Sequence, residues 1–276
     1  MSENPRTIAR YLKEAGLHEL TTEVVCFRDV NTFGDEERAL FKTVLDQVEG
    51  TLATKETIFH PQGGGQPSDR GIITDKNNAQ LHFEVKLVRK LPSGLILHAG
   101  NRFPAGSETV FHGSQSVVLS VDSVTRNYHS RLHTAGHLIG LAVRRLSATI
   151  GPVEELKANH APGSAFVEFK GLIGGEHKTA IQHAVDNMVN SGLQVEVCWW
   201  DAKQVREKCT AVPESVAFHP GEDLMRVVQV QGLGAYPCGG THLPTTTDVG
   251  KITVRRISRQ KGISKISYEV QFEKSD

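Results

Sequence analysis

Two short segments of the sequence each carry a pair of side chains that bind transition metals. His133 and His137 are the ends of the string HTAGH, and Cys238 and His242 are the ends of CGGTH. On a helix, residues four apart lie about one turn from each other, so the two imidazoles of the first pair could reach one ion. Three imidazoles and one thiolate are a donor set that suits zinc. The sequence therefore predicts a Zn2+ site made by these four side chains.

The two histidines of the first pair are not part of an apolar helix face. At roughly 100° per residue, they point away from the apolar side of the expected helix. That side is formed by Leu132, Ala135, Ile139, Ala142 and Leu146. Position 134 is threonine, so the glutamate of an HExxH metallopeptidase is missing. Four bound side chains would close the site, whereas three would leave a position open for water or substrate.

A glycine-rich segment at residues 57–71 reads TIFHPQGGGQPSDRG. Gly63, Gly64 and Gly65 would let the backbone approach a ligand closely, because glycine has no side chain to block it. A hairpin turn that ends at Pro67 would explain the same residues. The glycine pattern alone favours neither interpretation.

These candidate residues lie in two parts of different character. Residues 1–121 are strand-rich, with short apolar runs near 71–74, 81–87, 95–97 and 116–121, which predicts a small barrel-like domain. Residues 35–50 have a helical composition. From Asp122, a plausible N-cap, we expect a long helix to about residue 147 and a second helix at 176–191.

The rest of the second part, residues 122–276, is expected to be mainly strands. They are predicted at 194–200, 224–230, 251–257 and 266–272, the last with alternating apolar and polar residues. Helices on an antiparallel sheet make an α+β domain. The predicted fold class is thus α+β, with a barrel-like N-terminal domain followed by an α+β metal-binding domain.

The overall composition indicates a protein without a strong charge or a membrane segment. Lys plus Arg and Asp plus Glu both total 31, so any nucleic-acid surface must be local. We expect no signal peptide and no bilayer-spanning run, which favours a cytoplasmic protein with no membrane partner and no evident obligate protein partner. Four cysteines in 276 residues do not make a disulfide framework.

Taken together, HTAGH, CGGTH and the glycine-rich segment resemble the freestanding alanyl-tRNA editing proteins of the AlaX family, similar to the editing domain of alanyl-tRNA synthetase. The resemblance runs from about residue 50 to the end. Threonyl-tRNA synthetases share the paired HxxxH and CxxxH strings, but GGGQP looks like the alanyl type. Two departures are His60, where the family has tyrosine, and the segment 157–169.

The resemblance implies a zinc-dependent hydrolase that removes a wrongly attached amino acid from tRNA(Ala), with Ser-tRNA(Ala) as the expected substrate and Gly-tRNA(Ala) as a second. Thr57 and Gln66 are the candidates for sensing the serine hydroxyl, beside the glycines. A basic segment without acids is the candidate tRNA track or, alternatively, a solvated hairpin. It contains Lys251, Arg255, Arg256, Arg259, Lys261 and Lys265. Two further interpretations stay open: an inactive tRNA-binding module stabilised by zinc, and a small-molecule metallohydrolase.

Overall fold

The computed structural model describes residues 6–104, 111–212 and 223–271, in two compact units. The first unit contains residues 1–63 and 67–126, and the second contains residues 64–66 and 127–276. The three residues 64–66 of the glycine-rich segment therefore group with the second unit. The predicted boundary before Asp122, and the roles assigned to the two parts, stay predictions.

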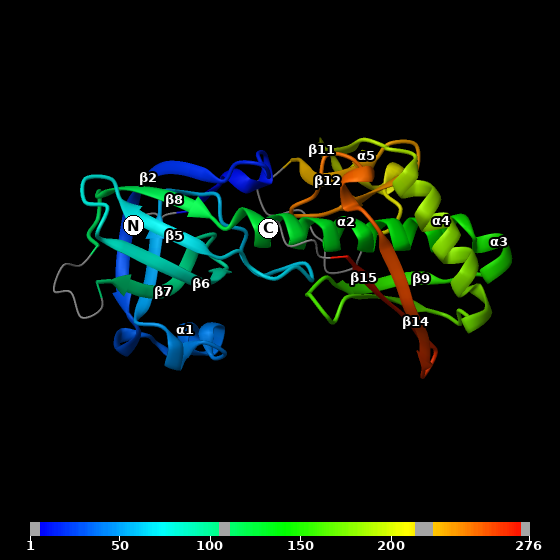
Figure 1. Ribbon diagram of the computed structural model, residues 1–276, viewed down its shortest axis with the longest axis horizontal. Helices are drawn as coiled ribbons and strands as arrows, with labels where there is room; N and C mark the ends of the chain where they lie inside the picture. Colours follow the sequence, from blue (N-terminus) through cyan, green and yellow to red (C-terminus); the bar gives the residue numbers. More distant parts are fainter. Residues whose placement is uncertain (1–5, 105–110, 213–222, 272–276) are drawn as a thin grey trace. The chain divides into compact units, whose positions relative to one another are not determined.

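The first unit is a closed antiparallel barrel (Figure 1). Its strands follow the order β2-β3-β7-β6-β5-β8, and β8 pairs with β2 to close the ring. The alternation seen in the sequence places Ile73, Phe83 and Leu119 in the interior, all fully buried. The barrel strands are β2 (Glu19–Asp29), β3 (Gly50–Thr54), β5 (Gly71–Asp75), β6 (His82–Lys90), β7 (Ile96–Phe103) and β8 (Ser116–Val121).

Shorter elements complete this unit. Strand β1 (Ile8–Ala9) pairs in parallel with β4 (Glu56–Thr57), which carries the start of the glycine-rich segment. The helical composition of residues 35–50 yields only α1 (Asp35–Phe41) and a 3-10 turn at Leu45–Gln47. Two other 3-10 turns lie at Arg10–Leu12 and Val30–Thr32.

The long predicted helix is present as α2 (Ser123–Arg145). Its start is capped by Asp122, whose Oδ1 accepts a hydrogen bond of 3.0 Å from the Thr125 amide. Residues 132–143 are all buried, on the side that carries the histidines as well as on the apolar side. This part of the helix is thus enclosed within the second unit, and its polar side chains must find partners inside the protein.

The second unit packs helices against two antiparallel sheets (Figure 1). One sheet has the order β14-β15-β10-β9 and the other β11-β12-β13. Its strands are β9 (Glu154–Asn159), β10 (Phe166–Lys170), β11 (Val195–Trp200), β12 (Met225–Val230), β13 (Gly234–Pro237), β14 (Ile252–Gln260) and β15 (Ile263–Val270). Its other helices are α3 (Ser147–Ile150), α4 (Lys178–Asn190) and α5 (Ala202–Lys208), with 3-10 turns at Gly175–His177 and Thr247–Val249.

The predicted α+β class and the barrel are confirmed, with differences in detail. In β15, Ile266, Tyr268 and Val270 are buried as the alternation predicted, while Phe272 lies outside the described residues. Strands β9 and β10 were not predicted, because β9 reads EELKAN and shows no apolar alternation. Among the described residues, no helix is long and apolar enough to cross a membrane.

Candidate functional site

The four predicted metal ligands meet in the second unit. One ligand atom from each of His133, His137, Cys238 and His242 can be chosen so that all lie within 4.8 Å of one another. Helix α2 supplies the first two, whose ring centroids are 5.0 Å apart, and the turn after β13 supplies the others. The two helical histidines are buried, at 2% and 7% exposure. The sequence spacing therefore brings together a group that could hold a metal ion.

The ring of His133 is oriented by the amide of Gln66. The Gln66 Oε1 atom accepts hydrogen bonds from the Thr241 backbone amide at 3.0 Å and from Nδ1 of His133 at 2.7 Å. Gln66 Nε2 in turn donates to Thr241 Oγ1 at 2.8 Å. Because Nδ1 carries the proton, Nε2 of His133 is left with a lone pair. That nitrogen lies 3.4 Å from the sulfur of Cys238.

His242 is oriented in the same way by Thr134. The Thr134 hydroxyl donates to the Ser130 carbonyl at 2.8 Å, so it accepts from Nδ1 of His242 at 3.2 Å. The Nε2 atom of His242 again carries the lone pair, 3.3 Å from Cys238 Sγ. The threonine that replaces the metallopeptidase glutamate thus has a role in holding a ring.

This arrangement fits a bound cation. Two imidazole lone pairs face one sulfur, which has at most one proton to share between them. A cation among the three atoms would satisfy all of them, and a tetrahedral zinc would set nitrogen and sulfur ligands about 3.6 Å apart. The ring of His137 adds a buried Nδ1 atom that has no hydrogen-bonding partner in the described part of the chain. The residues present therefore fit a zinc ion.

The electrostatics of the site also favour neutral imidazole ligands. Burial, with smaller contributions from His160 and Arg226, lowers the pKa of His137 to about 3. Burial raises the pKa of the Cys238 thiol above its ordinary value, while the Arg226 guanidinium and the Gly240 amide act in the opposite direction. A metal ion would reverse the effect of burial on this thiol, because it stabilises the thiolate directly.

One of the two glycines in CGGTH is required by the packing. A Cβ atom on Gly240 would lie 2.2 Å from Cε1 of His133 and 2.7 Å from Gln66 Oε1. A side chain there would push the His133 ring out of place. Gly239 has open space around it, so the need for glycine is specific to position 240.

The glycine-rich segment contributes backbone conformation as well as Gln66. Gly64 and Gly65 have φ values of +56° and +79°, which favour glycine. A Cβ atom on Gly65 would lie 2.4 Å from the Ala158 carbonyl, and the Gly65 carbonyl accepts from the His160 amide at 2.8 Å. Gly63 meets no such restriction. The close approach shown by the structure is therefore to the end of β9, and an approach to a ligand stays a prediction.

Thr57 lies in the barrel unit, where its hydroxyl already has partners. Nδ1 of His98 donates to the Leu52 carbonyl at 2.8 Å, so its Nε2 atom accepts from Thr57 Oγ1, also at 2.8 Å. Thr57 Oγ1 accepts in turn from the Phe59 amide at 3.1 Å. Its role as a hydroxyl sensor stays a prediction, and it has one remaining lone pair with which to act.

The structure adds a histidine that the sequence did not single out. The ring of His160 stacks on that of His133, with centroids 4.1 Å apart and an interplanar angle of 23°. Its Nδ1 donates to Tyr268 Oη at 2.7 Å, and that hydroxyl donates to the Leu132 carbonyl at 2.9 Å. His160 follows β9 in a segment that departs from the family pattern, so neither motif nor apolar alternation could have indicated it.

The candidate tRNA track lies mainly on the β14–β15 hairpin. Arg256, Arg259 and Lys261 are exposed, and Lys261 forms the turn with a φ of +50°. Arg255 pairs with Glu269 on the neighbouring strand at 3.0 Å, and Lys265 lies over the ring of Phe166. Lys251, just before β14, is exposed as well. The charge is therefore partly compensated by an acid that the sequence segment itself did not contain.

The sequence of this chain is similar to alanine–tRNA ligases and to an alanyl-tRNA editing protein. Residues 225–267 match the model of the threonyl and alanyl tRNA synthetase second additional domain. The chain is 26% identical over 268 residues to the alanyl-tRNA editing protein AlaX-L of Pyrococcus horikoshii, covering 95% of this chain and 56% of that protein. It is 31% identical over 233 residues to the alanine–tRNA ligase of Korarchaeum cryptofilum, covering 82% of this chain and 24% of the ligase.

Other ligases match in the same manner. Identity to the alanine–tRNA ligase of Methanosphaera stadtmanae is 26% over 85% of this chain and 26% of the ligase. The chain thus spans about a quarter of the length of these ligases. The comparisons confirm that this chain resembles the alanyl-tRNA editing proteins whose motifs it carries.

Proposed function

We propose that the protein is a trans-acting, zinc-dependent aminoacyl-tRNA deacylase that hydrolyses mischarged tRNA(Ala). The seryl ester is its main substrate and the glycyl ester a second. The observation that carries the proposal is the convergence of two oriented imidazole lone pairs on Cys238, beside His137. The similarity to AlaX-L supports tRNA(Ala) as the carrier.

In this proposal, His133, His137, Cys238 and His242 hold the zinc ion. When bound, zinc would supply Lewis-acid chemistry, either by lowering the pKa of water or by anchoring the substrate amino group. The chain's own residues prepare the donors. Gln66 keeps the proton of His133 on Nδ1, and Thr134 does the same for His242. Water adds to the ester carbonyl, the bond to the ribose oxygen breaks, and that oxygen takes a proton.

Selectivity for the amino acid is assigned to the glycine-rich segment. Gly63, Gly64 and Gly65 would bring backbone close to the aminoacyl group, and Gln66 and Thr57 would sense the serine hydroxyl. The alanyl group has no hydroxyl, so the protein group that pairs with the serine hydroxyl would be left unpaired. The pocket can therefore reject the alanyl ester, which is the correctly charged one. Arg255, Arg256, Arg259, Lys261 and Lys265 are the proposed phosphate contacts.

The replacement Thr57→Val tests this assignment. We expect it to reduce the preference for seryl over alanyl ester by about tenfold, because a hydrogen bond to the substrate hydroxyl is lost. Thr51→Val is the matched control, since Thr51 is also buried in the barrel and its hydroxyl has no partner among the described residues. Equal selectivity in both variants, measured as a ratio of kcat/KM values, would remove Thr57 from the proposal.

The main experiment compares deacylation of Ser-tRNA(Ala), Gly-tRNA(Ala) and Ala-tRNA(Ala) by zinc-loaded protein. His137→Ala, shown to be folded, serves as the inactive control. Rapid loss of the seryl ester alone supports the proposal. Tight tRNA binding without hydrolysis would favour an inactive binding module, and hydrolysis of a free seryl ester at the same rate would favour a small-molecule metallohydrolase.

A further inference from the structure

The third imidazole of the metal group is held differently from the other two. Gln66 and Thr134 orient His133 and His242 by hydrogen bonds. In the described part of the chain, no hydrogen bond holds the ring of His137. This ring packs on that of Tyr236 instead, with centroids 4.5 Å apart and an interplanar angle of 36°. The ring also packs on that of His242, with centroids 4.6 Å apart. Of these two neighbours, Tyr236 is the one outside the ligand group, so the contacts that hold Tyr236 bear on the position of His137.

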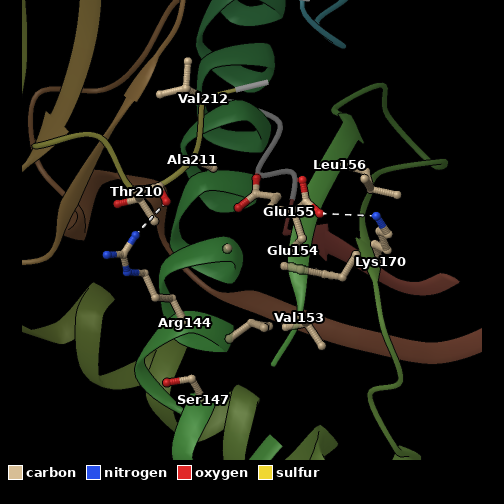
Figure 2. A pocket seen from close by; sticks show the side chains of 13 residues that line it. Arg144, Ser147, Val153, Glu154, Glu155, Leu156, Lys170, Thr210, Ala211 and Val212 are labelled. Carbon is tan, nitrogen blue, oxygen red and sulfur yellow. Dashed lines mark hydrogen bonds and ion pairs between the residues drawn. The ribbon is translucent and has the colours of Figure 1, made fainter. Parts of the chain in front are cut away.

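Tyr236 is itself held by a carboxyl group from another sheet. Its hydroxyl donates a hydrogen bond of 3.1 Å to Oε2 of Glu155 on β9. Glu155 lies against α2, whereas the carboxylate of the preceding Glu154 pairs with Lys170 (Figure 2). Successive strand residues point to opposite faces, so Glu155 is aimed at the helix while its neighbour is aimed away from it.

The helix leaves room for this contact at Gly140, three residues after His137. A Cβ atom at this position would lie 2.4 Å from Glu155 Oε2 and 2.5 Å from Tyr236 Oη. Glycine therefore lets the hydrogen-bonded pair rest directly on the helix that carries the ligand. A methyl group there would displace the two oxygens without changing a ligand or a ligand's neighbour in the chain.

Burying the ionisable carboxyl group of Glu155 at this place is unfavourable in free energy. Burial raises its pKa to about 7, although the Tyr236 hydrogen bond acts to lower it. The carboxyl group borders a pocket of about 800 Å³ whose wall also includes Gly140 and Arg144 (Figure 2). An apolar side chain would fill this place at lower cost if packing were its purpose. Its contact with the tyrosine hydroxyl gives the carboxyl group a specific use.

We propose that Glu155 and Tyr236 form a positioning pair that sets the ring of His137 and so tunes the metal centre. The pair touches neither substrate nor metal and acts through the imidazole. This inference rests on the proposed metal centre and deepens it, while its main readout does not require turnover.

The test compares variants that break the pair with variants that keep it. Tyr236→Phe and Glu155→Leu remove one partner each, and Gly140→Ala displaces both oxygens. Glu155→Gln keeps an acceptor for the tyrosine hydroxyl, and Glu154→Leu is the matched neighbour control. The measurements are zinc affinity by chelator competition and the visible absorption spectrum of the cobalt-substituted protein. Thermal unfolding of the metal-free protein reports on packing alone.

We expect the three disrupting variants to weaken zinc binding by about tenfold and to shift the cobalt bands, as changes around metal ligands do. Glu155→Gln and Glu154→Leu should match the wild type. Unchanged affinity and spectrum in all three folded variants would overturn the proposal, as would a loss of metal-free stability with no change in metal binding. If the disrupting variants change zinc affinity and the cobalt spectrum but the wild type does not deacylate tRNA, the positioning pair is supported and the proposed function is rejected.

Discussion

The two units of the chain both bury histidines, but the hydrogen-bond partners of the ring nitrogens differ between them. In the barrel, both nitrogens of His98 have a partner, the Leu52 carbonyl at one and the Thr57 hydroxyl at the other. In the second unit, His133 and His242 also have a partner at Nδ1, yet their Nε2 atoms converge on one sulfur. His137 adds a buried nitrogen without a partner in the described chain.

This difference separates a structural histidine from a candidate ligand. Burying a polar ring nitrogen is unfavourable unless it is hydrogen-bonded, and the barrel pairs both nitrogens of His98 with its own neighbours. The buried ion pair of the first unit also has its partners within that unit, because Arg126 donates hydrogen bonds to Asp69 and to the Ile58 carbonyl. At the metal group of the second unit, two imidazole lone pairs face a sulfur with at most one proton to donate, so a cation would fit as the partner of these atoms.

Replacement of one histidine in each unit should give the largest contrast. We expect His133→Ala to lose bound zinc and to reduce deacylation by roughly a thousandfold, since metal chemistry contributes several kcal/mol. His98→Ala should lower the melting temperature but keep zinc and most activity per folded molecule. Zinc content and single-turnover rates measure both. Full zinc occupancy in folded His133→Ala would break the comparison.

The residues that orient the rings should matter next. Gln66→Leu removes the acceptor that holds His133, and we expect zinc affinity to fall by about ten- to a hundredfold. The control is Gln62→Leu, because Gln62 is exposed and uses its backbone amide to contact Val88. Competition with a chromogenic chelator gives both affinities. Equal affinities would show that the ring of His133 keeps its position without Gln66.

The part of the site that sequence could predict is the part whose spacing is local. HTAGH and CGGTH each bring two ligands together within one turn of chain, and the resemblance associates the two strings. The pairing of Gln66 with His133 joins residues 67 positions apart and depends on tertiary structure. His160 was missed for the same reason, since it reaches His133 only when β9, which has no apolar alternation, has paired in its sheet.

The pH dependence of stability should distinguish the structural histidine in the barrel. Burial lowers the pKa of His98 to about 4, below the ordinary value of 6.5. The unfolded chain therefore takes up this proton first as the pH falls, and the stability present above pH 6.5 is lost on the way down to about 4. Between pH 7 and pH 5 the loss should be about 2 kcal/mol.

The measurement is urea unfolding of wild type and His98→Gln at both pH values with zinc chelated. All other titratable groups are the same in the two proteins, so their contributions cancel in the difference. The variant should lose about 2 kcal/mol less than the wild type. Parallel losses in the two proteins would show that His98 is not a neutral, structural group.

The smallest expected effect concerns surface charge. Replacing Arg256, Arg259 and Lys261 together by glutamine should raise KM for seryl-tRNA by about a few-fold. It should also reduce the salt dependence of kcat/KM, because the variant makes fewer phosphate contacts and its binding therefore releases fewer counterions. Arg255→Gln should do less, since its guanidinium already pairs with Glu269. Lys76→Gln, on the exposed surface of the barrel unit, is the control. If Lys76→Gln changes the salt slope as much as the triple variant, the β14–β15 hairpin is a solvated strand pair and tRNA is held elsewhere.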